Sequence, residues 1–106
     1  MPDLTNTFGL SVELHDFSQA QYEEYQPLVL KAARDNYFDF GVENGGGLTA
    51  NAVVRGATIR AAVRTKILTG ITLEDVGKMT PAAATWLAGK IEEHVREITN
   101  PPPDPN

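Results

Sequence analysis

The sequence predicts a helix-dominated α+β domain, with a short N-terminal strand followed by three main helices and one short helix. Apolar residues alternate with polar ones over residues 8–14, which is the period of a half-buried strand. Farther along the chain, apolar residues recur every three or four positions, and a serine or threonine suited to cap a helix precedes three of these segments. We expect one domain over residues 1–100 and a proline-rich tail over residues 101–106.

The first helix is expected from Gln19 to Asn36. Ser18 and Gln21 have the spacing of a capping box, in which each side chain bonds the backbone N–H of the other residue. Phe17 and Tyr22 flank this box and are placed to form a hydrophobic staple. The inner stripe of the helix is expected to contain Tyr22, Tyr25 or Gln26, Val29 and Ala33.

Two sequences are expected to interrupt the helical pattern. Pro27 lacks a backbone donor and its ring clashes with the carbonyl four residues earlier, so we expect a kink or a break near residues 23–26. The glycine cluster at residues 45–47 precedes a helix, as a phosphate-binding loop would. No lysine follows it at the required spacing, so a flexible connector is the preferred interpretation.

The second helix is expected from Asn51 to Leu68, with Gly70 ending it. Its buried stripe is expected to contain Ala52, Gly56, Ile59, Val63 and Ile67. A capping box at residues 72–75 predicts a short third helix, because Gly77 follows closely.

The last helix has the clearest boundaries in the sequence. Thr80 is placed to cap it and Pro81 occupies its first position, where proline loses no hydrogen bond. The sequence Asn100-Pro101 should end it. The inner face is expected to contain Ala84, Leu87, Ile91, Val95 and Ile98, and Glu92 and Arg96 should pair four residues apart on another face.

Residues with catalytic or metal-binding chemistry are sparse. The chain has no cysteine, and neither of its two histidines has metal-ligand spacing. Acidic residues that are adjacent in the sequence point about 100° apart on a helix, which suits solvated faces better than acid–base catalysis. We therefore expect no enzyme activity, no catalytic residue, no metal site and no cofactor.

The net charge of −5 argues against binding of the whole domain to nucleic acid or to an anionic membrane. No apolar run approaches the roughly 18 residues of a membrane-spanning helix. The N-terminal residues lack the basic and apolar regions of a signal peptide. The expected location is the cytoplasm.

Four residues are candidates for partner binding. Arg55, Arg60 and Arg64 lie in a segment that has no acidic residue, and the last two share a helix face. They could pair with acidic helices of the same domain, contact a partner protein, or contact nucleic acid. For nucleic acid, the four cations of the segment, which are these three arginines and Lys66, are a weak footprint. Trp86 lies at the edge of the predicted inner face of the last helix, so it is either a core-edge residue or an exposed contact residue.

Several segments resemble small proteins encoded in the tail operons of tailed bacteriophages. They are residues 14–22, 54–63, 73–76 and 79–91, the last beginning with Met79-Thr80-Pro81 and leading to the proline-rich end. On these segments the chain resembles a tail assembly chaperone of a siphophage-type phage or prophage, acting in the host cell cytoplasm.

The resemblance implies a non-enzymatic protein that escorts the helical tape measure protein during virion assembly. Such a chaperone would offer apolar helix faces with a polar rim, from one copy or from several copies together. Two alternatives remain open. One is a regulatory or inhibitory module that binds a host protein or nucleic acid through Arg55, Arg60 and Arg64, and the other is a structural tail component that self-associates through the last helix.

Overall fold

A computed structural model describes residues 9–40 and 52–100 and confirms the predicted helix-dominated α+β class. The elements in chain order are β1 (Glu13–Leu14), α1 (Gln19–Phe40), α2 (Ala52–Arg64), β2 (Leu68–Thr69), α3 (Leu73–Lys78) and α4 (Pro81–Thr99). The predicted glycine connector and proline tail lie outside the described residues. Among the helices that the structure describes, none is both long and apolar enough to cross a membrane.

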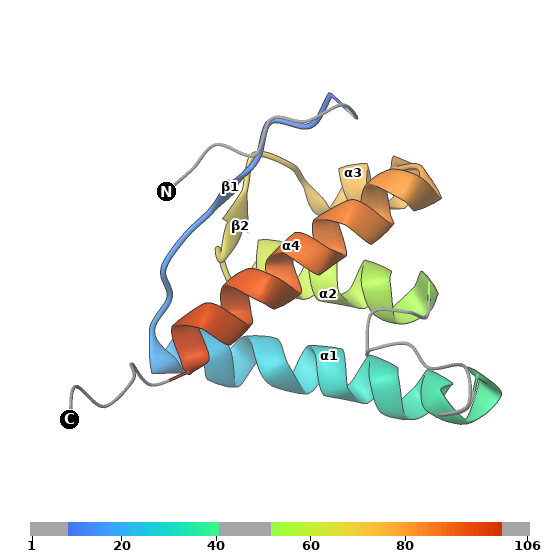
Figure 1. Cartoon of the computed structure of the whole chain (residues 1–106), viewed down its shortest axis with the longest axis horizontal. Coiled ribbons are helices and arrows are strands. Elements are labelled where there is room, and N and C mark those ends of the chain that lie inside the picture. The colour runs from blue at the N-terminus through green and yellow to red at the C-terminus, as the bar shows by residue number, and fades with distance from the viewer. Residues whose placement is uncertain (1–8, 41–51, 101–106) are drawn as a thin grey trace.

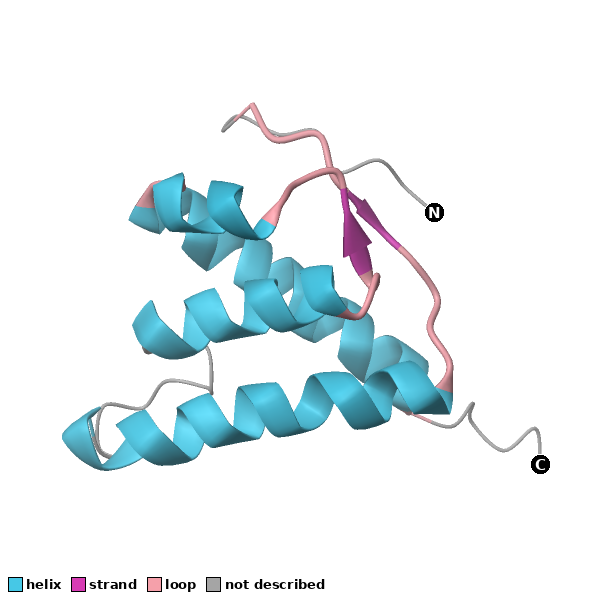
Figure 2. Cartoon of the chain, turned by 180° about the vertical axis from the view of Figure 1, so that it is seen from behind, coloured by secondary structure: helices cyan, strands magenta, loops and turns pink. Residues whose placement is uncertain are grey.

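The central element of the fold is α2. It packs against α1 on one side and against α4 on another, whereas α1 and α4 make few direct contacts with each other. Figure 1 shows α4 running diagonally across α2, so that its C-terminal end comes close to the start of α1. The view from behind shows α1 and α2 side by side, with α3 beyond α2 (Figure 2).

The core is formed around α2 by residues from every element. Ile59 and Ala62 of α2 are fully buried, as are Leu87, Ala88 and Ile91 of α4. The small alanine side chains let neighbouring helices approach α2 closely. From α1, the core takes Tyr25, Val29 and Ala33, which selects Tyr25 over Gln26 for the predicted inner stripe.

Helix α1 begins as predicted. The Ser18 backbone N–H donates to Gln21 Oε1 at 2.9 Å, and the Gln21 N–H donates to Ser18 Oγ at 3.2 Å. The predicted staple is present, with the Phe17 and Tyr22 rings 5.9 Å apart.

Of the kink or break predicted near residues 23–26, the break is wrong, because α1 runs through Pro27 without interruption. The helix also continues past its predicted end at Asn36 to Phe40. Pro27 lies on the exposed side of the helix, and Tyr25 and Val29 on either side of it are both buried. Burial on both sides therefore outweighs the loss of one backbone hydrogen bond.

The end of α2 differs from the prediction. The helix stops at Arg64, and Lys66 takes a left-handed conformation with φ of 67°, the role that Gly70 was expected to play. The predicted buried stripe is only partly correct, because Ala52 is exposed while Val54, Thr58, Ala61 and Ala62 are buried. Contacts with both α1 and α4 bury more than one stripe of this helix.

Leu68 belongs to a strand that the sequence did not predict. β2 pairs antiparallel with β1, placing Leu68 opposite Leu14 and Thr69 opposite Glu13. The alternation predicted for the N-terminal strand holds where it is described, since Val12 and Leu14 are buried and Glu13 is exposed. Ladder pairing is confined to two residues, so the strand is shorter than expected.

Helices α3 and α4 start as predicted. Thr72 and Asp75 form the capping box of α3, and the Thr72 backbone N–H that donates to the Asp75 carboxylate lowers the pKa of that group. Thr80 caps α4 by accepting from the Ala83 N–H at 3.2 Å, with Pro81 in the first position. Along α4, Leu87, Ile91 and Val95 are buried, and Ala84 and Ile98 are half-buried.

Gly70 provides a test of this packing, because it has φ of +105° and a Cβ there would lie 2.5 Å from the Ser11 carbonyl oxygen. We expect Gly70→Ala to lower the free energy of unfolding by about 2 to 4 kcal/mol. Gly89→Ala is the control, because a Cβ in that helical position meets nothing within 4 Å. It should raise stability by about 0.5 to 1 kcal/mol. Urea unfolding followed by circular dichroism measures both, and equal effects of the two substitutions would contradict the packing described.

Candidate protein-binding groove

A groove lies between the first half of α1 and the second half of α4, with α2 beneath it. We call it the α1–α4 groove. It has a volume of about 120 Å³ and is lined by Tyr22, Tyr25, Gln26, Val29, Leu30, Thr58, Glu92 and Val95. Sites for metabolite-sized ligands are typically about 300–1,000 Å³, so this groove is of a size to take one side chain.

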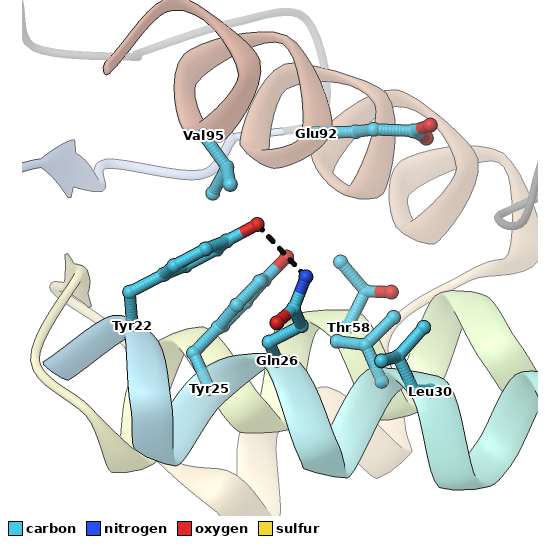
Figure 3. A pocket seen from close by; sticks show the side chains of 8 residues that line it. Tyr22, Tyr25, Gln26, Leu30, Thr58, Glu92 and Val95 are labelled. Atoms are coloured by element: carbon cyan, nitrogen blue, oxygen red, sulfur yellow. Dashed lines mark hydrogen bonds between the residues drawn. The ribbon is translucent and has the colours of Figure 1, made fainter. Parts of the chain in front are cut away.

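Two tyrosines form one wall of the groove. The Tyr22 and Tyr25 rings are stacked, with their centres 6.2 Å apart and their planes inclined by 20°. Figure 3 shows both phenol groups extending from α1 toward α4. Gln26 Nε2 donates to the Tyr22 hydroxyl at 3.1 Å, which fixes the position of that oxygen.

The Tyr25 hydroxyl is different, because no residue that the structure describes forms a hydrogen bond with it. Tyr25 as a whole is only 5% exposed. Burial, the negative charge of Glu92 and the neighbouring Tyr22 all raise the pKa of this phenol above the ordinary value of 10.0. The group is therefore a neutral, buried hydroxyl that faces the groove.

The other polar groups of the lining have partners. Thr58 Oγ1 donates to the Val54 carbonyl oxygen at 2.9 Å. Glu92 pairs with Arg96 at 3.5 Å, as the sequence predicted, although the Arg96 side chain is largely exposed. Among the described residues that line the groove, Glu92 is the one with a charged side chain.

An apolar side chain borders the groove. Leu30 is 48% exposed and belongs to the lining. Leu28 is similarly exposed at 41% but is not part of the lining. Since the two residues are about 200° apart on an ideal helix, they face different sides of α1.

The four predicted contact residues lie outside this groove. Arg60 and Arg64 are exposed on one face of α2 and form no ion pair with any described residue. The Arg60 guanidinium lies beside Gly56, 2.9 Å from where a Cβ would be, and approaches Gly77 of α3. For these two arginines, the expected pairing with acidic helices is therefore not found within the described part of the chain.

Arg55 does not extend that arginine face, and Arg55 and Trp86 are both half-buried. On an ideal helix Arg55 is about 140° from Arg60 and 180° from Arg64, so the three arginines do not form a single stripe. Trp86 packs against the core from α4, which agrees with the core-edge interpretation.

The histidines have structural roles. His94 Nε2 lies 2.8 Å from the His15 carbonyl oxygen and links α4 to the residue after β1. His15 Nε2 lies 2.7 Å from Thr69 Oγ1 next to the sheet. Within residues 9–40 and 52–100, no three side chains of the metal-ligating types are grouped as a metal site would require.

The sequence indicated the tyrosines of this groove as core residues and did not indicate the groove. The missed signal is Leu30, an apolar residue next to the inner stripe on a helix with polar outer faces.

No known protein family, curated protein or solved structure matches the chain.

The buried phenol makes stability depend on pH. The unfolded chain ionises Tyr25 at its ordinary pKa, whereas the folded chain keeps the proton, so the folded state binds more protons above that pH. This contribution to stability is complete below about pH 10 and falls by up to about 1.4 kcal/mol per pH unit above it.

Tyr25→Phe removes this contribution. The free energy of unfolding, measured in urea between about pH 8 and 11, should therefore decline less steeply for Tyr25→Phe than for the unsubstituted protein. Parallel curves for the two proteins would contradict the environment described for Tyr25.

Proposed function

We propose that this chain is a non-enzymatic tail assembly chaperone that binds a helix of the tape measure protein in the α1–α4 groove. The observation that carries the proposal is a groove between two helices that have few contacts with each other, bordered by the exposed Leu30. An amphipathic helix binds such a groove by inserting one anchor side chain into it while the apolar face of the helix packs against the groove border.

The composition of the groove suits this mode of binding. Val29, Leu30 and Val95 supply apolar contact surface, and Tyr22 adds an aromatic side chain that is half-buried. Gln26 and Glu92 provide polar groups beside them. An apolar centre with polar neighbours is the usual composition of a protein–protein contact. The resemblance to tail assembly chaperones identifies the proposed binding partner as the tape measure protein, which we call the client.

The exposed leucines of α1 provide a matched pair of variants for this proposal. We expect Leu30→Glu to reduce capture of the client by about tenfold, because it places a charge at the apolar contact. Leu28→Glu makes the same change at a similarly exposed position outside the groove and should leave capture within about twofold. The measurement is co-expression with the longest helical protein encoded beside this chain, followed by pull-down and size-exclusion chromatography.

Other outcomes contradict the proposal. Equal loss of capture in both leucine variants would show that general surface charge, and not the groove, controls binding. Absence of any complex with the unsubstituted protein would exclude this client. A chain that assembles alone as its concentration is raised would favour a structural tail component.

The arginine face supports a second candidate function. Arg60 and Arg64 are exposed cations without an ion pair in the described part of the chain, as expected of a surface that binds an acidic protein or nucleic acid. Thr58 lines the groove and is about 200° from Arg60 on an ideal helix. The two surfaces can therefore be tested separately.

A double variant with Arg60→Glu and Arg64→Glu reverses the charge of the arginine face and distinguishes binding by that face from binding by the groove. If the groove is the contact surface, the double variant should retain client capture within about twofold at every salt concentration. Loss of capture in this variant, together with binding by the unsubstituted protein that weakens steeply with salt, would favour the arginine face. A gel-shift titration with duplex DNA measures the nucleic-acid alternative directly.

A further inference from the structure

The α1–α4 groove combines three features that a purely apolar contact does not require. They are a buried hydroxyl without a described partner on Tyr25, a stacked pair of aromatic rings, and a carboxylate on Glu92. Among the described residues that line the groove, none is cationic. These features together select for the chemistry of the side chain that enters.

We propose that the groove is a binding site for one arginine side chain, presented by the helix of the client. The aliphatic stem of the arginine lies along Val29, Leu30 and Val95. Its guanidinium lies against the tyrosine rings and donates to the Tyr25 hydroxyl, and the negative charge of Glu92 attracts it. That the arginine belongs to the client rests on the proposed function. The preference of the groove for an arginine side chain does not.

The Tyr25 hydroxyl carries the first step of this inference. A buried polar group normally has a hydrogen-bond partner, and a ligand that leaves it without one binds less well. A phenol oxygen can accept from a guanidinium N–H and still keep its own proton. An apolar side chain of equal size would fill the volume but leave this hydroxyl unsatisfied.

Glu92 and the aromatic rings favour a positive charge on the side chain that binds in the groove. The carboxylate attracts a cation and repels an anion, and the ring faces of Tyr22 and Tyr25 also attract cations. The ion pair that Glu92 forms with Arg96 weakens this attraction, and in that pair the atoms are 3.5 Å apart and the Arg96 side chain is 63% exposed.

The planar shape of the ring pair favours arginine over lysine. A guanidinium is flat, stacks on aromatic faces and presents several N–H donors in a fixed arrangement. It can therefore contact a ring and donate to a hydroxyl at the same time. An ammonium group is compact and more strongly hydrated, and it gains less from a half-enclosed aromatic site.

A small probe tests the site without any client. The full chain, labelled with ¹⁵N, is titrated with n-butylguanidinium and separately with n-butylurea, which has a similar shape and no charge. We expect saturable shifts of the Tyr25, Gln26 and Glu92 amide signals, with n-butylguanidinium binding about tenfold more tightly than n-butylurea. Pentanoate should cause no saturable shift at these residues.

Two variants on α4 provide a matched comparison of charge. Glu92→Gln should weaken n-butylguanidinium binding by about fivefold or more. Glu93→Gln removes the same charge from an exposed neighbour that does not line the groove, so it should change binding by less than about twofold. Tyr25→Phe should also weaken binding, provided that circular dichroism shows a folded protein.

Several results would overturn the inference. They are equal affinities for n-butylguanidinium and n-butylurea, equal effects of Glu92→Gln and Glu93→Gln, or probe shifts confined to residues outside the groove. If the probe binds as expected but no client is captured, the proposed function fails and the arginine site remains. If client capture depends on Leu30 but the probe shows no preference for charge, the arginine site fails alone.

Discussion

The burial of α2 between α1 and α4 determines how the rest of the fold is arranged. Ile59 and Ala62 are fully buried, and α2 makes contacts with both long helices, with α3 and with β2. At about 25 cal/mol per Å² of buried apolar surface, these contacts are the main source of stability available to a domain of this size. Because α1 and α4 both pack on α2, they come close to each other without replacing it as a partner.

This arrangement explains why a groove with unusual polar groups lies over the core. Thr58 of α2 contributes to the lining, while α1 provides the tyrosines and α4 provides Glu92 and Val95. Tyr25 belongs both to the core and to the groove, since it is only 5% exposed and its phenol extends toward α4 in the groove lining. Any ligand of this hydroxyl therefore contacts a residue that also holds α1 on α2, which links binding to the stability of the fold.

The sequence predicted the starts of the helices well and their ends less well. The caps at Ser18, Thr72 and Thr80 are local, since each depends on residues within three positions, and all three are present. The end of α2 depends on β1, more than fifty residues away, which pairs with residues 68–69 and draws them out of the helical pattern. The break predicted at Pro27 is wrong for a similar reason, because packing against distant residues compensates for the local cost of proline in a helix.

Of the candidate site, the sequence could indicate the residues but not their convergence. The spacing of apolar residues places Tyr22 and Tyr25 on the inner stripe of the first helix and Glu92 on an outer face of the last helix. Only the crossing of α1 and α4 brings them together, and that crossing is set by contacts of both helices with α2.

The most direct test of this account is an NMR map of the client-binding surface on the ¹⁵N-labelled chain, made with the full-length helical client. The account predicts that amide shifts gather at residues 22–30 of α1 and 92–95 of α4, whereas shifts gathered around Arg60 and Arg64 instead would contradict it.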